Sequence, residues 1–123
     1  MENDVVNAKE LERLYILFSS CSPVFIALGD EVRQKLVLDL AEACLQDENG
    51  INVTNLSAKS RLSRPAISHH LKVLKDCGLV KPVKVGTQIF YRLSLEDSIG
   101  DMGELISSIQ RILSVMKPHP ATV

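Results

Sequence analysis

The segment SRPAISHHLKVLKDCGLV, residues 63–80, has little freedom in how it can fold. Ser63 and Pro65 predict a helix start, because a serine hydroxyl caps free N–H groups and a first-turn proline needs no partner for its nitrogen. Apolar side chains then recur at spacings of four and three, at Ile67, Leu71 and Leu74. Such a stripe must face a core. We therefore predict a helix over residues 64–77.

Burial of that stripe leaves the opposite side of the helix in solvent. The polar residues expected there are Arg64, Ser68, His69 and Lys72. Arginine can donate twice to guanine, serine and histidine can donate or accept at base edges, and lysine neutralises phosphate. The N–H groups that follow Ser63 can also hold a phosphate. The segment therefore predicts a surface that reads DNA.

The charge along the chain supports a polyanionic partner. The formal net charge is −1, yet residues 59–92 hold eight Lys and Arg residues against one acid, Asp76, a net charge of +7. The remaining residues carry −8. A surface that needs only solubility mixes the two signs, so this division indicates a nucleic-acid face. A chance cluster of solvated lysines is the alternative.

The residues before this segment predict further helices. Residues 8–20 carry apolar side chains at spacings of three and four, at Leu11, Leu14, Tyr15 and Phe18. Ser22 and Pro23 predict another helix start, with a break near Gly29. The helix after the break is expected to bury Val32, Leu36, Val37, Leu40 and Cys44. A short helix over about residues 53–60 is expected to face Leu56 inward.

The residues after it predict a hairpin and a final helix. Two β-rich runs lie within residues 79–94, and Gly86 with Thr87 between them predicts the turn. Pro82 has no N–H to donate, so the first strand is expected at a sheet edge. Residues 96–116 repeat apolar side chains at helical spacing, and the tail over 117–123 is expected to be flexible.

This order of elements predicts a winged helix-turn-helix. Two short helices joined by a tight turn, over residues 53–77, precede a two-stranded wing over residues 79–94. The fold is therefore expected to be mainly α, with about five or six helices and a small β-hairpin. A chain of 123 residues that is 46% hydrophobic is about the size of one domain, which we expect to span residues 1–123.

Composition predicts a cytoplasmic protein. No uninterrupted apolar run reaches the roughly 18 residues needed to span a bilayer, so we expect no membrane partner. The N-terminal MENDVVNAKELER is acidic and polar, unlike a signal peptide. The three cysteines, Cys21, Cys44 and Cys77, include no closely spaced pair and are expected to be thiols.

Two runs carry a family resemblance: ALGDEVRQKLVLDL and LSRPAISHHLKVLKDCGLVKPVKVGTQIFYRLS. With the flanking helices they resemble the ArsR/SmtB family of dimeric bacterial winged-helix repressors, over about residues 10–115. The resemblance implies that the helix over 64–77 reads operator DNA and that the wing contacts the flanking backbone. The residues assigned to DNA binding are Ser63, Arg64, Ser68, His69, His70, Lys72, Lys84 and Thr87.

The resemblance also implies a homodimer formed by the first and last helices, over about residues 8–20 and 96–116. The predicted interface residues are Leu11, Leu14, Tyr15, Phe18, Met102, Leu105, Ile106, Ile109, Ile112 and Leu113. Two-fold symmetry would place two recognition helices about 34 Å apart, so the operator should be an imperfect palindrome. The expected function is a sequence-specific, DNA-binding transcriptional repressor whose inducer the sequence does not identify.

The metal sites of this family have no counterpart in the sequence. Metal sensors of the family often carry Cys-x-Cys before the recognition helix, but residues 52–54 read Asn-Val-Thr, and the last helix has neither His nor Cys. Its acids Asp97, Asp101 and Glu104 could bind a hard cation, yet acids in the first turns of a helix also stabilise its dipole. We therefore predict no metal and no cofactor.

The adjacent histidines are also unsuited to a metal site. Neighbouring residues on a helix point about 100° apart, so His69 and His70 cannot chelate one ion together. His69 is expected in the groove. For His70 a ring packed near the helix-turn-helix junction and a DNA contact both remain open.

The sequence does not predict an enzyme. It has no glycine-rich phosphate loop, no Ser/His/Asp or Cys/His arrangement and no close acid pair in an expected cleft. One alternative function is a winged-helix module that binds protein, but such a module should expose apolar residues on the helix over 64–77. The other is a thiol-based redox-sensing repressor, for which no cysteine pair can be placed within bonding reach.

Overall fold

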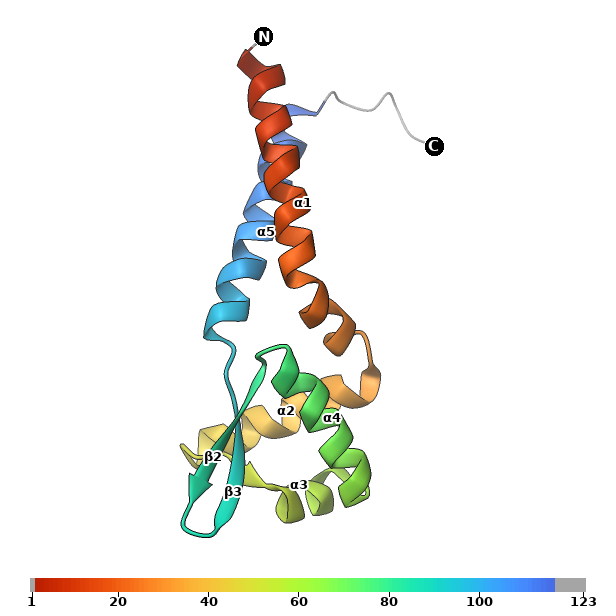
Figure 1. The fold of residues 1–123 in the computed structure, drawn as a ribbon, viewed down its shortest axis with the longest axis vertical. Helices are drawn as coiled ribbons and strands as arrows, with labels where there is room; N and C mark the ends of the chain where they lie inside the picture. Colours follow the sequence, from red (N-terminus) through yellow and green to blue (C-terminus); the bar gives the residue numbers. More distant parts are fainter. Residues whose placement is uncertain (1, 117–123) are drawn as a thin grey trace. The chain divides into compact units, whose positions relative to one another are not determined.

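The computed structural model describes residues 2–116, so the tail expected to be flexible lies outside the described residues. The described helices are α1 (Glu2–Leu28), α2 (Glu31–Gln46), α3 (Val53–Ser60), α4 (Arg64–Asp76) and α5 (Glu96–Val115). The strands are β1 (Ile51–Asn52), β2 (Val80–Val85) and β3 (Gln88–Leu93), as Figure 1 shows. They form two compact units, one from the described parts of residues 1–21 and 99–123 and one from residues 22–98.

The first unit pairs α1 with α5, which lie side by side in Figure 1. Its small core consists of Leu17, Cys21 and Leu105, with Leu14, Met102 and Ile109 packed against it. Polar contacts join the same two helices. The Glu10 carboxylate accepts hydrogen bonds from Arg111 Nε at 2.7 Å and Ser108 Oγ at 3.1 Å. The bond from Arg111 is the main reason that the pKa of Glu10 is lowered.

The second unit contains the predicted winged helix-turn-helix. Its core is built from fully buried side chains of α2, α3, α4 and the loop that follows α4: Leu36, Leu40, Leu56, Ile67, Leu74 and Leu79. α3 packs against both α2 and α4, and α2 packs against β3. The predicted bounds of α3 and the inward position of Leu56 are confirmed, and α4 begins as predicted but ends at Asp76, one residue earlier than expected.

The sheet has three antiparallel strands in the order β1-β3-β2. The hairpin is confirmed: Val85 pairs with Gln88, and the turn between them contains Gly86 at φ 62°. β2 lies at the edge, as the position of Pro82 predicted. Sequence reasoning missed β1, whose two residues pair with β3. The wing is therefore anchored to the start of α3 by a third strand.

The predicted helix start at Pro23 was wrong, because α1 runs unbroken to Leu28 with the proline inside it. An internal proline removes one backbone hydrogen bond and usually kinks or ends a helix. Here a buried apolar face continues on both sides of the proline, at Leu17, Cys21, Val24 and Ala27. Burial of this face outweighs the local cost, so Cys21 lies inside a helix rather than between two helices.

The predicted inward face of α2 was only partly right. Leu36 and Leu40 are fully buried as predicted. Near the end of the helix, however, Ala43 is the buried residue, and Cys44 is only half-buried. Val32 is exposed because it borders an open pocket of about 270 Å³ between the start of α2 and the turn after α3. Side chains at the first turn of this helix are therefore only partly covered.

One helical segment, Ala8–Leu28, is long and apolar enough to cross a membrane by length and composition alone. The segment is not an unbroken apolar run, because it mixes apolar residues with serines and a few charges. A helix that buries one face in a soluble protein passes the same test, so the finding is weak evidence for a membrane.

Candidate DNA-binding surface

The N-terminus of α4 is capped as its sequence predicts. Ser63 has an extended backbone, and its hydroxyl accepts a hydrogen bond from the N–H of Ala66 at 3.3 Å. Pro65 lies in the first turn, where its nitrogen needs no partner. Arg64 is the first helical residue and is exposed. The capped end therefore presents its first-turn side chains to solvent.

The two faces of α4 are divided as predicted. Ile67 and Leu74 are fully buried and Leu71 is almost so. Arg64, Ser68, His69 and Lys72 are all exposed. The Lys72 ammonium lies 2.9 Å from the carboxylate of Asp76, but both side chains are largely exposed. Exposed pairs of this kind contribute little to stability, so Lys72 can exchange this partner for a phosphate at small cost.

A pocket of about 260 Å³ lies beside the exposed face of α4. It is lined by residues of the helix and by one strand residue: Ser68, Leu71, Lys72, Lys75, Asp76 and Tyr91. Two lysines and a serine border this hollow together with a tyrosine ring. Its lining therefore mixes charged, polar and apolar side chains.

The wing presents the predicted residues at its tip. Lys84 and Thr87 are exposed on either side of Gly86. One contact there was not predicted: Asn52 Nδ2 donates to Gln88 Oε1 at 3.0 Å. The Oδ1 atom of Asn52 also accepts from the N–H of Asn55 at 2.9 Å and so caps α3. One amide side chain thus ties the wing tip to the helix-turn-helix.

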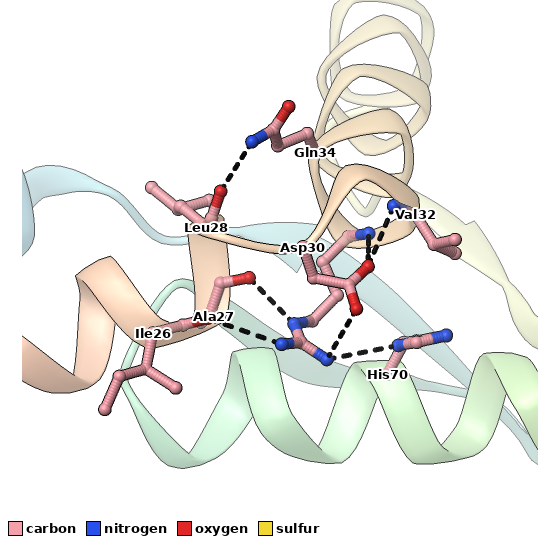
Figure 2. Close-up of polar contacts among 8 residues, drawn as sticks. Ile26, Ala27, Leu28, Asp30, Val32, Gln34 and His70 are labelled. Atoms are coloured by element: carbon pink, nitrogen blue, oxygen red, sulfur yellow. Dashed lines mark hydrogen bonds and ion pairs between the residues drawn. The ribbon is translucent and has the colours of Figure 1, made fainter.

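His70 differs from the other predicted DNA-binding residues because it is half-buried. Its Nδ1 atom lies 3.5 Å from Nη1 of Arg33, which comes from α2 (Figure 2). Its ring is 5.4 Å from the ring of His69, edge to face. Burial is the main cause that lowers the pKa of His70, and the charges of Arg33 and His69 add to it, while Asp30 opposes them.

Arg33 contacts three segments, whose residues Ala27, Asp30 and His70 are labelled in Figure 2. Its Nε donates to the carbonyl of Ala27 at 2.7 Å and its Nη2 donates to that of Ile26 at 3.3 Å, both at the end of α1. Asp30 lies 3.7 Å from the guanidinium and caps α2 by accepting from Val32 N at 2.8 Å. Sequence reasoning missed this role, because nothing local in the sequence indicates contacts that arise from the tertiary fold.

The remaining candidate groups are the cysteines and the acids of α5. Among residues 2–116 no cluster of three or more His, Cys, Asp or Glu side chains could hold a metal ion. Cys44 and Cys77 are half-buried, whereas Cys21 is buried. The Cys77 thiol donates to the carbonyl of Leu74 at 3.3 Å. Of the three acids on α5, Glu104 pairs with Arg13.

Comparison with known proteins identifies the family. A model described as bacterial regulatory protein, arsR family, matches residues 31–81, from α2 to the start of β2. The transcriptional repressor SdpR of Bacillus subtilis is 32% identical over 87 residues, which cover 68% of this chain and 90% of that repressor. This chain belongs to the ArsR family. Its relatives are transcriptional regulators, a class of proteins without enzymatic activity.

Solved structures agree with this ArsR-family assignment. An ArsR-like transcriptional regulator from Rhodococcus matches with a TM-score of 0.61 and 31% identity, over 79% of this chain and 82% of that one. A homodimeric winged helix-turn-helix DNA-binding domain from Mycobacterium bovis matches with a TM-score of 0.58 and 23% identity, over 88% and 94%. The second match shows a shared fold.

Proposed function

We propose that this ArsR-family protein is a homodimeric repressor that reads a palindromic operator, with α4 in the major groove and the wing on the flanking backbone. The observation that carries the proposal is the polar face of α4. Ile67, Leu71 and Leu74 hold the helix on the core, and apart from Pro65 in its first turn the exposed residues of α4 are polar or charged. The relative SdpR is named a transcriptional repressor, which supports repression here.

Each proposed contact follows from the chemistry of its side chain. Arg64 can read guanine with two hydrogen bonds, and Ser68 and His69 can bond other base edges. Ser63, at the helix N-terminus, together with Lys72, Lys84 and Thr87, would hold phosphates. The contact between His70 and Arg33 favours the packed role over a DNA contact for His70. Direct contacts to bases are thus assigned to Arg64, Ser68 and His69.

The charge distribution supports this partner. The segment with a net charge of +7 runs from the end of α3 through α4 to the end of β3. α4 packs against β2, so the helix and the wing lie next to each other within one compact unit. A continuous basic surface neutralises several phosphates at once, which gives affinity for any duplex before bases are read. A regulator of chromosomal DNA would act in the cytoplasm.

The proposed dimer rests on apolar side chains that one chain leaves exposed. On α1 these include Leu11, Tyr15 and Phe18, and Tyr15 is 74% exposed. On α5 they include Ile106 and Leu113, at 56% and 58% exposed. Ile112 is half-buried, whereas Leu105, Leu14, Met102 and Ile109 already belong to the core of the unit. Exposed patches of this kind mark protein interfaces, and a second copy would cover them.

The competing function, a module that binds protein, would need apolar residues on the exposed side of α4. Among the described residues, the large exposed apolar side chains lie on α1, α2 and the two longer strands and on or just after α5, and none lies on α4. The thiol-based alternative would need two of the cysteines to meet. The buried position of Cys21 limits its access to oxidants.

DNA binding is tested by selecting duplexes from genomic fragments with the purified chain and measuring affinity at several salt concentrations. Each phosphate contact should add about −0.9 to the slope of log K against log salt, so a dimer should give a slope of several units. The expected result is a set of fragments that share an inverted repeat with half-sites one helical turn apart. Binding that does not depend on salt, or no duplex binding at low salt, would refute the proposal.

A further inference from the structure

The guanidinium of Arg33 makes polar contacts with both the end of α1 and the proposed recognition helix α4. Its hydrogen bonds to Ala27 and Ile26 use carbonyls of the last turn of α1, where the helix offers no further i+4 donors; the Ile26 carbonyl also accepts from Gly29 N–H at 3.3 Å. The planar fork of arginine then directs Nη1 toward His70, as Figure 2 shows. A shorter or non-planar side chain could not make all these contacts together.

His70 is the point on α4 where such a contact influences DNA reading. It follows His69, which is exposed on the proposed reading face, and it precedes Leu71, which is buried in the core. A contact to His70 therefore restrains the rotation of α4 about its own axis. Because bidentate contacts to bases need accurate placement, a small rotation would weaken them.

We propose that Arg33 is a positioning residue for DNA recognition: it holds α4 through His70 against the end of α1, and it does so only while the imidazole of His70 is uncharged. The inference rests on the proposed role of α4 in DNA binding. Arg33 itself contacts no base in this scheme.

The restriction to the uncharged ring follows from the donors that meet at this contact. Arginine can only donate, whereas the Nδ1 atom of a neutral imidazole can accept. Once the ring gains a proton, both of its nitrogens donate and two cations lie 3.5 Å apart at their nearest nitrogens. The contact then changes from attractive to repulsive.

Three charged or titratable groups act on the His70 ring. Asp30, in the loop before α2, favours the charged ring, whereas Arg33 on α2 and His69 on α4 oppose it, together with burial. The balance lowers the pKa of His70, so the folded state keeps the ring neutral to a lower pH than the unfolded chain does. The stabilisation is therefore present above the ordinary titration range of histidine and is lost as the pH falls through the folded-state pKa.

The sign of the effect on DNA binding distinguishes this role from a direct contact. If His70 bound a phosphate, a proton on its ring would strengthen binding as the pH falls. If His70 positions α4 through Arg33, the proton would weaken binding. A change of pH also alters binding through groups other than His70, so the contribution of His70 must be measured as a ratio between two proteins.

The experiment compares the wild type with His70→Asn, whose amide oxygen can replace Nδ1 as an acceptor but cannot take a proton. Operator fragments selected at about pH 8 are titrated with both proteins by fluorescence anisotropy at about pH 8 and about pH 5.5, at constant ionic strength. The ratio of the wild-type Kd to the variant Kd should rise at least about threefold in acid, up to about tenfold for each unit by which the His70 pKa differs between free and bound protein. A ratio that stays constant or falls would overturn the inference.

Two further variants identify the role of Arg33. Arg33→Gln should weaken binding at about pH 8 and should also abolish the acid-dependent part, because no cation then faces the ring. Lys35→Gln removes the same charge from the same helix and should keep the wild-type acid dependence. If Lys35→Gln behaved like Arg33→Gln, general charge rather than positioning would be responsible. Thermal unfolding at both pH values shows that each variant is folded, and a wild type that binds no duplex at about pH 8 would instead refute the proposed function.

Discussion

Substitution of Ile106 by Asp should separate the proposed dimer without unfolding the chain. Ile106 lies on α5 and is 56% exposed in the single chain, so little intrachain packing depends on it. Ile109 is a less clear test, because it packs against the cluster of Leu17, Cys21 and Leu105. A charge at position 109 would therefore disturb the chain as well as the interface.

The expected size of the effect follows from burial and symmetry. Full burial of an isoleucine contributes about 1.5–3 kcal/mol, and about half of that surface remains to be covered by a partner, so its loss costs about 1 kcal/mol. An uncompensated buried carboxylate adds about 3 kcal/mol or more. Each substitution occurs twice in a two-fold dimer, which gives about 8 kcal/mol, or about a millionfold in the dimer dissociation constant.

Sedimentation velocity over a range of concentrations measures this change. Leu38→Asp is the matched control, because Leu38 is 69% exposed on α2 and lies outside the proposed interface. Ile106→Asp should be a monomer that has lost operator binding, although α4 is unchanged, whereas Leu38→Asp should remain a dimer. A wild type that is monomeric at micromolar concentration, or an Ile106→Asp variant that still dimerises normally, would refute the reasoning.

Three further predictions concern the DNA-binding unit. Lys84→Ala should weaken binding to all duplexes alike, whereas Arg64→Ala should relax base preference at single positions by about 1–3 kcal/mol, as competition among altered operators would show. Gly50→Ala should destabilise the fold by more than about 3 kcal/mol in urea denaturation, because its φ is +88° and a Cβ would overlap a backbone carbonyl of β3. Gly86→Ala, at φ +62° with open space around it, should cost only about 1–2 kcal/mol. The pKa of Asp30 is lowered, chiefly by a hydrogen bond from the backbone N–H of Arg33. The stability that the Asp30 carboxylate gives the fold should therefore be lost as the pH falls through this lowered pKa, and Asp30→Asn should make the stability depend less on pH in acid.

The sequence predicted the elements whose causes are local. Ser63 and Pro65, which are two residues apart in the sequence, determine where α4 begins. Gly86 supplies the positive φ that the hairpin turn needs. The stripe of Ile67, Leu71 and Leu74 also determines which side chains remain outside. The exposed positions of Arg64, Ser68 and Lys72 could therefore be derived without any knowledge of their neighbours.

The sequence did not predict the features that depend on contacts between residues far apart in the chain. Pro23 reads as a helix start, yet burial on both sides of it keeps α1 continuous. β1 has only two residues, too few for a periodic signal, and exists because Tyr91 and Phe90 lie beside it. The contact between Arg33 and His70 joins residues 37 positions apart, so it depends on how α2 and α4 pack.

The edge position of β2 has a consequence for the behaviour of the protein at high concentration. An edge strand offers unpaired N–H and C=O groups that can recruit a strand from another molecule and so begin aggregation. In β2, Pro82 lacks an N–H, and the exposed lysines Lys81 and Lys84 repel a second copy of the same edge. Lys84, which is proposed to bind phosphate, would then also help Lys81 to keep the strand from pairing with itself. A variant that lost both lysines would gain a tendency to form fibres, and its loss of Lys84 would lower its affinity for DNA.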